Sequence, residues 1–95
     1  MAAQMKTGEG LVRVEFFGPF REFGHRVDLT VPSEVSFEEL VSLLEERVGP
    51  GFADRAARRN TTFILDSRIV PPQALGEVRV CPGDRAAFAL LVGGG

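Results

Sequence analysis

One stretch of the sequence carries a full set of helix signals, and it lies between segments that alternate like β-strands. It spans residues 32–50, PSEVSFEELVSLLEERVGP. Ser36 and Glu39 have the spacing of a capping box at the start of a helix, and Gly49 and Pro50 end it. Apolar residues recur along one side of this helix, at Phe37, Leu40, Val41, Leu44 and Val48. A single crossover helix cannot cover both faces of a doubly wound sheet. The pattern therefore predicts an α+β domain, with one main helix packed on one face of a mixed sheet.

Alternation of apolar and polar residues predicts the strands around this helix. The five predicted strands span residues 11–17, 25–31, 61–65, 69–70 and 86–92. The first two form a hairpin across a loop that contains glycine and proline, and a short helical turn is expected over residues 51–60. The element order is then β-β-α-β-β-β. We expect the last strand to lie inside the sheet beside the first.

Length and composition limit the remaining classes of protein. The 95 residues are enough for one domain, and 44% hydrophobic residues, 25% charged residues and a net charge of −2 are typical of globular proteins. Without an extended basic surface, nucleic acid is a disfavoured partner. No apolar run approaches the roughly 20 residues that span a bilayer, so no membrane partner is expected. A single cysteine and the absence of a signal-peptide pattern predict a cytoplasmic protein.

The usual catalytic side chains form no site in this sequence. His25 has no second ligand at metal-binding spacing, and Cys81 has no neighbouring histidine or helix N-terminus to lower its pKa. Two charged groups remain, and we interpret both as solvated surface. The first lies on the helix and consists of Glu38, Glu39, Glu45 and Glu46. The second follows the helix, consists of Arg55, Arg58 and Arg59, and could also bind an anion or an acidic partner. No metal or phosphate motif is present. We therefore expect no metal site, no bound cofactor and no catalytic groups of the chain's own.

The sequence ends in Gly93, Gly94 and Gly95, directly after the last predicted strand. We expect residues 1–10 to be a disordered leader, residues 11–92 the folded domain, and residues 93–95 a flexible tail. One interpretation of the tail is a frayed end without a function. The other is a substrate, because glycines without a Cβ can thread a channel barely wider than the backbone.

The terminal carboxylate of Gly95 is the group that such a tail would present. At neutral pH it is an anion and a poor electrophile, until a partner enzyme uses ATP to convert it to an acyl adenylate. A sulfur or amine nucleophile can then leave a thiocarboxylate or an amide. The three residues Gly93, Gly94 and Gly95 span only about 10 Å when fully extended. The folded domain must therefore dock at the mouth of the partner's cleft. The predicted docking residues are Phe17, Leu90, Leu91 and Val92.

Two separated motifs resemble the small subunit of molybdopterin synthase and related ubiquitin-like sulfur carriers. The first is VRVEFFGPFREFG, in which a hydrophobic strand that ends in Phe is followed by Arg21, Glu22 and Gly24. The second is PGDRAAFALLVGGG, with a Gly-Asp turn, a hydrophobic strand and a terminal Gly-Gly. The resemblance covers nearly all of residues 11–95 and implies a β-grasp fold. The sequence departs from the family pattern at Leu90 and Leu91, where two prolines are frequent, at Gly93, where a small residue other than glycine is common, and at Asp66, where Asn is frequent.

The resemblance also implies a mechanism and a set of partners. An E1-like adenylating enzyme activates Gly95, and sulfur from a sulfur donor protein is installed as a thiocarboxylate. The tail then enters the large catalytic subunit of molybdopterin synthase and passes its sulfur to a cyclic pyranopterin precursor in molybdenum cofactor biosynthesis. Three alternatives remain open: sulfur carriage for thiamine, tRNA thiolation or cysteine synthesis; ubiquitin-like attachment of Gly95 to lysines of target proteins; and a plain interaction module with an idle tail.

Overall fold

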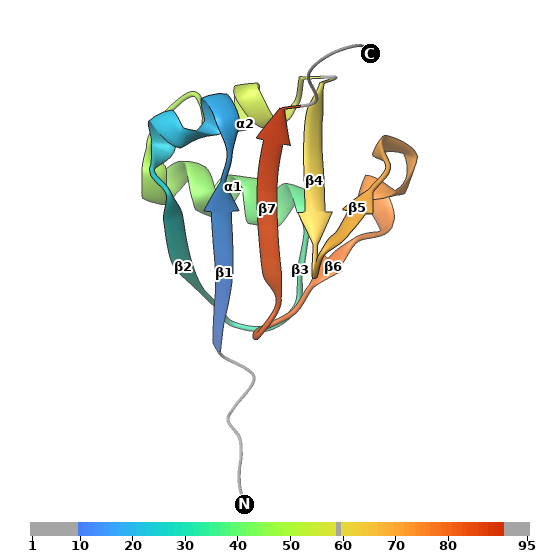
Figure 1. Cartoon of the computed structure of the whole chain (residues 1–95). Helices are drawn as coiled ribbons and strands as arrows, with labels where there is room; N and C mark the ends of the chain where they lie inside the picture. Colours follow the sequence, from blue (N-terminus) through green and yellow to red (C-terminus); the bar gives the residue numbers. More distant parts are fainter. Residues whose placement is uncertain (1–9, 59, 91–95) are drawn as a thin grey trace, which may run out of the picture.

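The computed structural model describes residues 10–58 and 60–90. Its main sheet has the strand order β2-β1-β7-β4-β5 (Figure 1). The strands are β1 (Gly10–Phe16), β2 (Arg26–Val31), β4 (Thr61–Leu65), β5 (Arg68–Val70) and β7 (Arg85–Leu90). β7 runs parallel to β1 and antiparallel to β4, so the sheet is mixed and the last strand lies beside the first. The predicted α+β architecture is confirmed.

The main helix, α1 (Phe37–Val48), begins where the sequence predicts. The Glu39 backbone N–H donates to Ser36 Oγ at 3.1 Å, and the Ser36 N–H donates to Glu39 Oε1 at 2.8 Å, which completes the capping box. Gly49, with φ of 119°, ends the helix in a conformation that favours glycine. The short helix α2 (Phe52–Ala56) follows. In Figure 1 both helices lie on the same side of the sheet, so its other side is left open.

The structure also contains short elements that the sequence analysis did not predict. Two 3-10 helices, η2 (Gly18–Phe23) and η3 (Pro72–Glu77), replace predicted loop. A two-stranded ladder joins β3 (Val35–Ser36) to β6 (Arg79–Val80). A strand of two residues has no alternation to detect, and a 3-10 turn lacks the 3.6-residue period of a longer helix.

Five phenylalanines fill the space between the sheet and the helices. The five, each no more than 2% exposed, are Phe16, Phe20, Phe52, Phe63 and Phe88. The Phe88 ring on β7 is the common neighbour, with centroid distances of 5.1 Å to both Phe52 and Phe63. The strand that leads to the C-terminal residues is therefore anchored at the centre of the core.

The turn between β4 and β5 explains one departure from the family pattern. Asp66 and Ser67 have φ values of 50° and 71°, a region in which Asn and Asp are the best-tolerated side chains after glycine. The Asp66 Oδ1 atom accepts the Arg85 backbone N–H at 2.9 Å, and the Asp66 N–H donates to the Arg85 carbonyl at 2.7 Å. An Asn side-chain oxygen would accept the same bond, so aspartate keeps the link between this turn and β7.

The predicted leader and tail fall mainly outside the described residues. Residues 1–9 and 91–95 lie outside them, and Gly10, which we assigned to the leader, is the first residue of β1. The division into leader, domain and tail therefore stays a prediction. Within the described ranges, no helix has the length and apolar character needed to cross a membrane.

Candidate functional site

Leu90 is the last residue of β7 and the last residue that the structure describes. On one side β1 stops earlier, because its last paired residue, Phe16, lies opposite Phe88. The Phe17 N–H still donates to the Phe88 carbonyl at 2.9 Å, and the chain then turns into η2. On the other side β4 continues, with Thr61 paired to Leu90. We call this end of the sheet, between η2 and the first residue of β4, the exit (Figure 1).

One wall of the exit is η2 together with Phe17. The Phe17 side chain is exposed, and the Arg21 guanidinium lies 6.0 Å from its ring centroid, at the limit of a cation–π contact. Arg21 Nε also donates to the Phe16 carbonyl at 3.1 Å. This bond satisfies a carbonyl at the end of β1 and holds η2 against the sheet.

The other wall is the start of β4 and the turn before it. The Thr61 N–H donates to the Arg58 carbonyl at 3.1 Å, and Thr61 Oγ1 donates to the Arg55 carbonyl at 2.9 Å. The first residue of β4 is therefore fixed to α2 and to the turn that follows it. Because Thr61 pairs with Leu90, these bonds also fix the point where β7 ends.

The structure places two of the predicted docking residues at this exit. Phe17 belongs to the η2 wall, and Leu90, which is half-buried, ends β7. The other two, Leu91 and Val92, lie outside the described residues. So do the residues of the predicted tail, Gly93, Gly94 and Gly95. Their roles in docking, threading and activation stay predictions.

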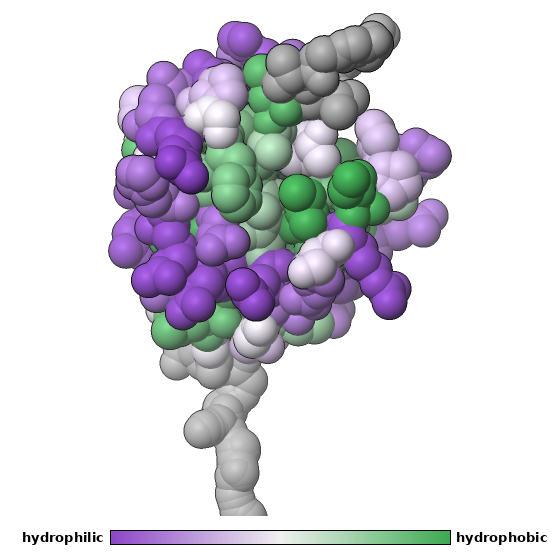
Figure 2. Space-filling model, viewed as in Figure 1, coloured by the Kyte–Doolittle hydropathy of each residue, from purple (hydrophilic) through white to green (hydrophobic). Residues whose placement is uncertain are grey.

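A larger apolar surface covers the open face of the sheet, the face opposite α1. Ile64 on β4 lies between Ile69 on β5 and Ala87 on β7. Ile69 is 70% exposed. Ala87 is buried yet does not belong to the core cluster, so its neighbours on the open face cover it. Figure 2 shows apolar residues gathered over β7, β4 and β5, with polar residues over β1 and β2.

The sequence analysis did not select Ile64 and Ile69 as docking residues. A signal was present for one of them: in a strand, Ile69 and Val70 must point to opposite faces. Val70 packs against the core, so Ile69 points away from it. The sequence alone did not say which of the two would be buried.

The conventional catalytic candidates form no reactive group. Glu39 caps α1, and Glu45 Oε2 accepts the Gly51 N–H at 3.0 Å, so both carboxylates serve helix ends. Burial raises the pKa of the Cys81 thiol, and nearby carboxylates, that of Asp84 first, raise it further. Cys81 is therefore a protonated thiol at neutral pH and a poor nucleophile. It precedes the start of β7, at the opposite end of that strand from the exit.

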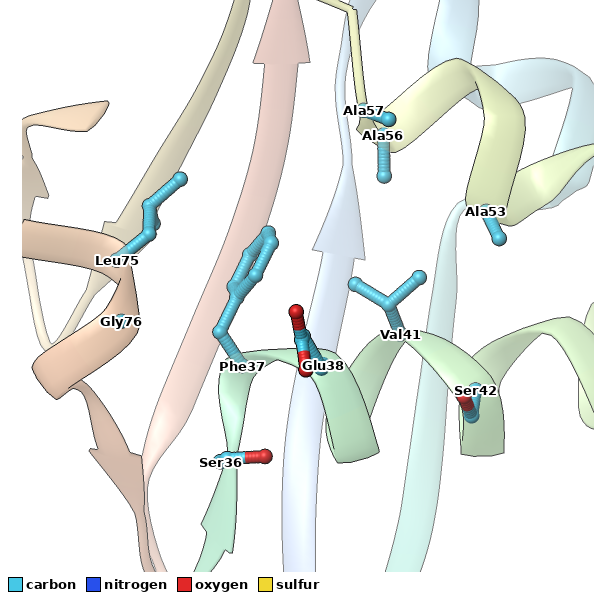
Figure 3. Close-up of a pocket in the computed structure, with 10 residues that line it drawn as sticks. All are labelled: Ser36, Phe37, Glu38, Val41, Ser42, Ala53, Ala56, Ala57, Leu75 and Gly76. Carbon is cyan, nitrogen blue, oxygen red and sulfur yellow. The ribbon is translucent and has the colours of Figure 1, made fainter. Parts of the chain in front are cut away.

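A groove lies on the helix side of the sheet and is a second candidate site. It has a volume of about 700 Å³ and lies between α1, α2 and η3 (Figure 3). Phe37 and Val41 rise into it from α1, and Leu75 reaches in from η3. Glu38 is its only charged lining residue, so it offers no pair of groups for acid–base chemistry. Across residues 10–58 and 60–90, no group of three or more His, Cys, Asp or Glu side chains could hold a metal ion.

Similar folds occur among solved protein structures. The HVO 2177 protein of Haloferax volcanii is 20% identical, with a TM-score of 0.72 over 97% of this chain and 92% of that one. The small archaeal modifier protein 1 of Methanosarcina acetivorans is 17% identical, with a TM-score of 0.60 over 92% of this chain and 98% of that one. No protein-family model matches the sequence, and no curated protein matches it. The predicted β-grasp fold, the fold of ubiquitin, is confirmed.

Proposed function

We propose that this chain is a sulfur carrier and the small subunit of a molybdopterin synthase. In this role the Gly95 carboxylate is adenylated and converted to a thiocarboxylate. The sulfur then passes to a cyclic pyranopterin precursor within a large catalytic subunit. The chain supplies the reacting carbonyl and the surface that brings it to each partner, and the partners supply the catalytic groups and ATP.

The position of β7 supports this proposal most directly. The core holds Phe88, and the described part of β7 ends two residues later, at the level of two walls that are hydrogen-bonded to the fold. A short segment that follows Leu90 therefore starts from a fixed place beside an exposed apolar face. Within the described residues no group of three or more His, Cys, Asp or Glu could hold a metal ion, and the pKa of the Cys81 thiol is raised. The two motifs of the sequence agree with this role.

The proposed chemistry has two steps on the carbonyl carbon of Gly95. In the first, a carboxylate oxygen attacks the α-phosphorus of ATP and pyrophosphate leaves, which gives an acyl adenylate. In the second, a persulfide of the sulfur donor protein attacks the carbonyl and AMP leaves. A thiol then reduces the resulting acyl disulfide and releases the thiocarboxylate. One carboxylate oxygen departs with AMP, and sulfur replaces it.

The test of this proposal is ATP–pyrophosphate exchange with the purified adenylating enzyme of the source cell. We expect exchange that depends on the carrier, and an intact mass for the native protein in which one oxygen of Gly95 is replaced by sulfur. Sulfur-transfer assays with a cyclic pyranopterin, the thiamine thiazole precursor and tRNA then identify the acceptor. Absence of an acyl adenylate at Gly95 would refute the carrier role, whichever acceptor is offered.

A second candidate function is attachment to other proteins. Similarity to a protein named as a small archaeal modifier favours it, because the same acyl adenylate can be attacked by a lysine amine in place of sulfur. Digestion of cellular proteins with trypsin, which cuts after Arg85, would then yield lysines that carry residues 86–95 as a remnant. Finding such remnants in the wild type and none after deletion of Gly95 would support the modifier role.

Ile69 gives the first test of the docking surface. We expect Ile69→Asp to raise the Kd for the adenylating enzyme about tenfold or more, because a charge would replace an exposed apolar anchor. The free energy of unfolding should change by less than about 1 kcal/mol, since the side chain is 70% exposed. Calorimetric titration measures the first effect and thermal unfolding the second.

Leu11 provides the matched control for this experiment. It is also an exposed apolar residue, at 54%, but it lies near the start of β1, at the end of the sheet away from the exit. Leu11→Asp should leave the Kd within about twofold of the wild type. Equal weakening by both substitutions would show that the contact does not centre on β4, β5 and β7.

A further inference from the structure

Arg55 is the only residue of the basic cluster whose side chain reaches η2 among the contacts of the described residues. Its Nη2 atom lies 2.6 Å from Glu22 Oε2. Its Nη1 atom donates to the Pro19 carbonyl at 3.4 Å, and its guanidinium lies 5.9 Å from the Phe23 ring centroid. The Arg55 side chain is 24% exposed and that of Glu22 is 54% exposed, so solvent still screens this ion pair in part. Three different groups of η2 are thereby attached to one side chain of α2.

The backbone of Arg55 holds the opposite wall of the exit. Its carbonyl accepts the Thr61 hydroxyl at 2.9 Å, and Thr61 pairs with Leu90. The side chain of one residue therefore contacts the η2 wall while its carbonyl contacts the β4 wall. The distance between the walls depends on how firmly Arg55 is held.

The wall formed by η2 is held in three places. Glycines with positive φ values lie at its first residue, Gly18 (59°), and directly after it, at Gly24 (125°). Phe20 is buried in the core, and Arg21 holds the element against the end of β1. The contacts of Arg55 add the attachment to α2.

Arg58 on the same side of the molecule behaves differently. Its side chain pairs with Asp54 at 3.8 Å, and the two side chains are 60% and 85% exposed. The two residues are four apart in the same helical segment, and their ion pair contacts neither η2 nor the start of β4. Arg59 lies outside the described residues. Arg55 and Arg58 therefore make different contacts.

We propose that Arg55 is a positioning residue that fixes the direction in which the chain leaves β7 at Leu90. Through Glu22 and Pro19 it holds η2 at a set distance from Thr61, so the segment after Leu90 starts between walls of constant spacing. The expected effect of Arg55 on the rate of adenylation rests on the proposed function. A segment of five residues has little length with which to correct a wrong starting direction, and small misplacements of a reacting group slow a reaction strongly.

The experiment compares Arg55→Met with Arg58→Met in the full chain. Methionine keeps the unbranched stem and has a similar helix propensity to arginine, so each variant removes a guanidinium and little else. For Arg55→Met we expect kcat of ATP–pyrophosphate exchange to fall about tenfold. The calorimetric Kd for the adenylating enzyme should stay within about twofold, because the open face is unchanged. Arg58→Met should match the wild type in both measurements.

A charge swap separates positioning from a general loss of stability. Arg55→Glu combined with Glu22→Arg restores the ion pair in the opposite sense, and we expect it to recover part of the lost kcat. Assays are run well below the Tm of each variant, where all are folded. An unchanged kcat in Arg55→Met, or an equal loss in Arg58→Met, would overturn the proposal.

A measurement without the enzyme keeps this inference separate from the proposed function. Residual dipolar couplings of the amides of Leu90, Leu91 and Val92, which precede the predicted flexible tail, report the direction of the chain after β7. They should change in Arg55→Met and stay the same in Arg58→Met. If the wild type is not adenylated but the couplings change as expected, the sulfur-carrier role fails and the positioning role stands. Unchanged couplings would overturn the positioning role even if adenylation occurs.

Discussion

Removal of Gly95 should abolish adenylation and leave the fold intact. Every buried residue of the described core lies at or before Phe88, and the last residue of β7 is Leu90. Loss of the final glycine takes nothing from that core, so the free energy of unfolding should change by less than about 0.5 kcal/mol. The carboxylate would move back by one residue, about 3.3 Å in an extended chain. That is too far for attack on an α-phosphorus held in place by the enzyme.

Two further variants of the protein complete this experiment. Adding one serine after Gly95 should abolish pyrophosphate exchange as fully as the deletion does, because the carboxylate would overshoot. Inserting one serine after Met1 lengthens the other end of the chain by one residue and should leave exchange unchanged. If the lengthened chain is activated at the wild-type rate, the terminal carboxylate of Gly95 is not the reacting group. Equal losses of stability and activity would show that the tail also supports the domain.

Phe88→Ala should cause the largest loss of stability in the molecule, about 3–5 kcal/mol. The Phe88 side chain is fully buried, and its ring lies 5.1 Å from both Phe52 and Phe63 and 5.8 Å from Phe20. Truncation leaves a cavity among aromatic rings that the surrounding strands and helices cannot close. For a domain of this size the whole free energy of unfolding is only about 5–15 kcal/mol. Urea denaturation measures the change.

Phe17→Ala is the control for this substitution, because it removes the same ring from an exposed position. The Phe17 ring is 41% exposed, and its recorded ring contact is the Arg21 guanidinium. We expect a loss below about 1 kcal/mol. If the two substitutions cost the same, the aromatic cluster around Phe88 is not the centre of the core.

The helix and the sheet order could be predicted because their signals are local or topological. Ser36 and Glu39 define the start of α1 within four residues of sequence, and the structure agrees. The place of β7 beside β1 followed from having only one long helix. The predicted first strand runs through Phe17, although this residue breaks the alternation of apolar and polar residues that begins at Val12. In the structure β1 ends at Phe16 and Phe17 begins the turn into η2, which explains the break in alternation.

The contacts that build the exit could not be predicted, because they join residues far apart in the sequence. Nothing in the local pattern pairs Arg55 with Glu22, and the basic cluster read as a solvated turn. Ile69 was missed for a different reason: its strand has three residues, too few to show which face is buried. Local patterns thus define elements, whereas the surfaces between elements depend on packing in three dimensions.

The central place of β7 also affects how the protein is made. β7 carries the last described residues of the chain, yet it lies between β1 and β4. During synthesis β1, β2 and α1 emerge first, but they cannot close the core until residues up to Leu90 have left the ribosome. A product that terminates or is cut before Phe88 would expose its other aromatic residues to proteases and chaperones. Folding therefore selects for molecules that carry the whole strand from which the C-terminal segment extends.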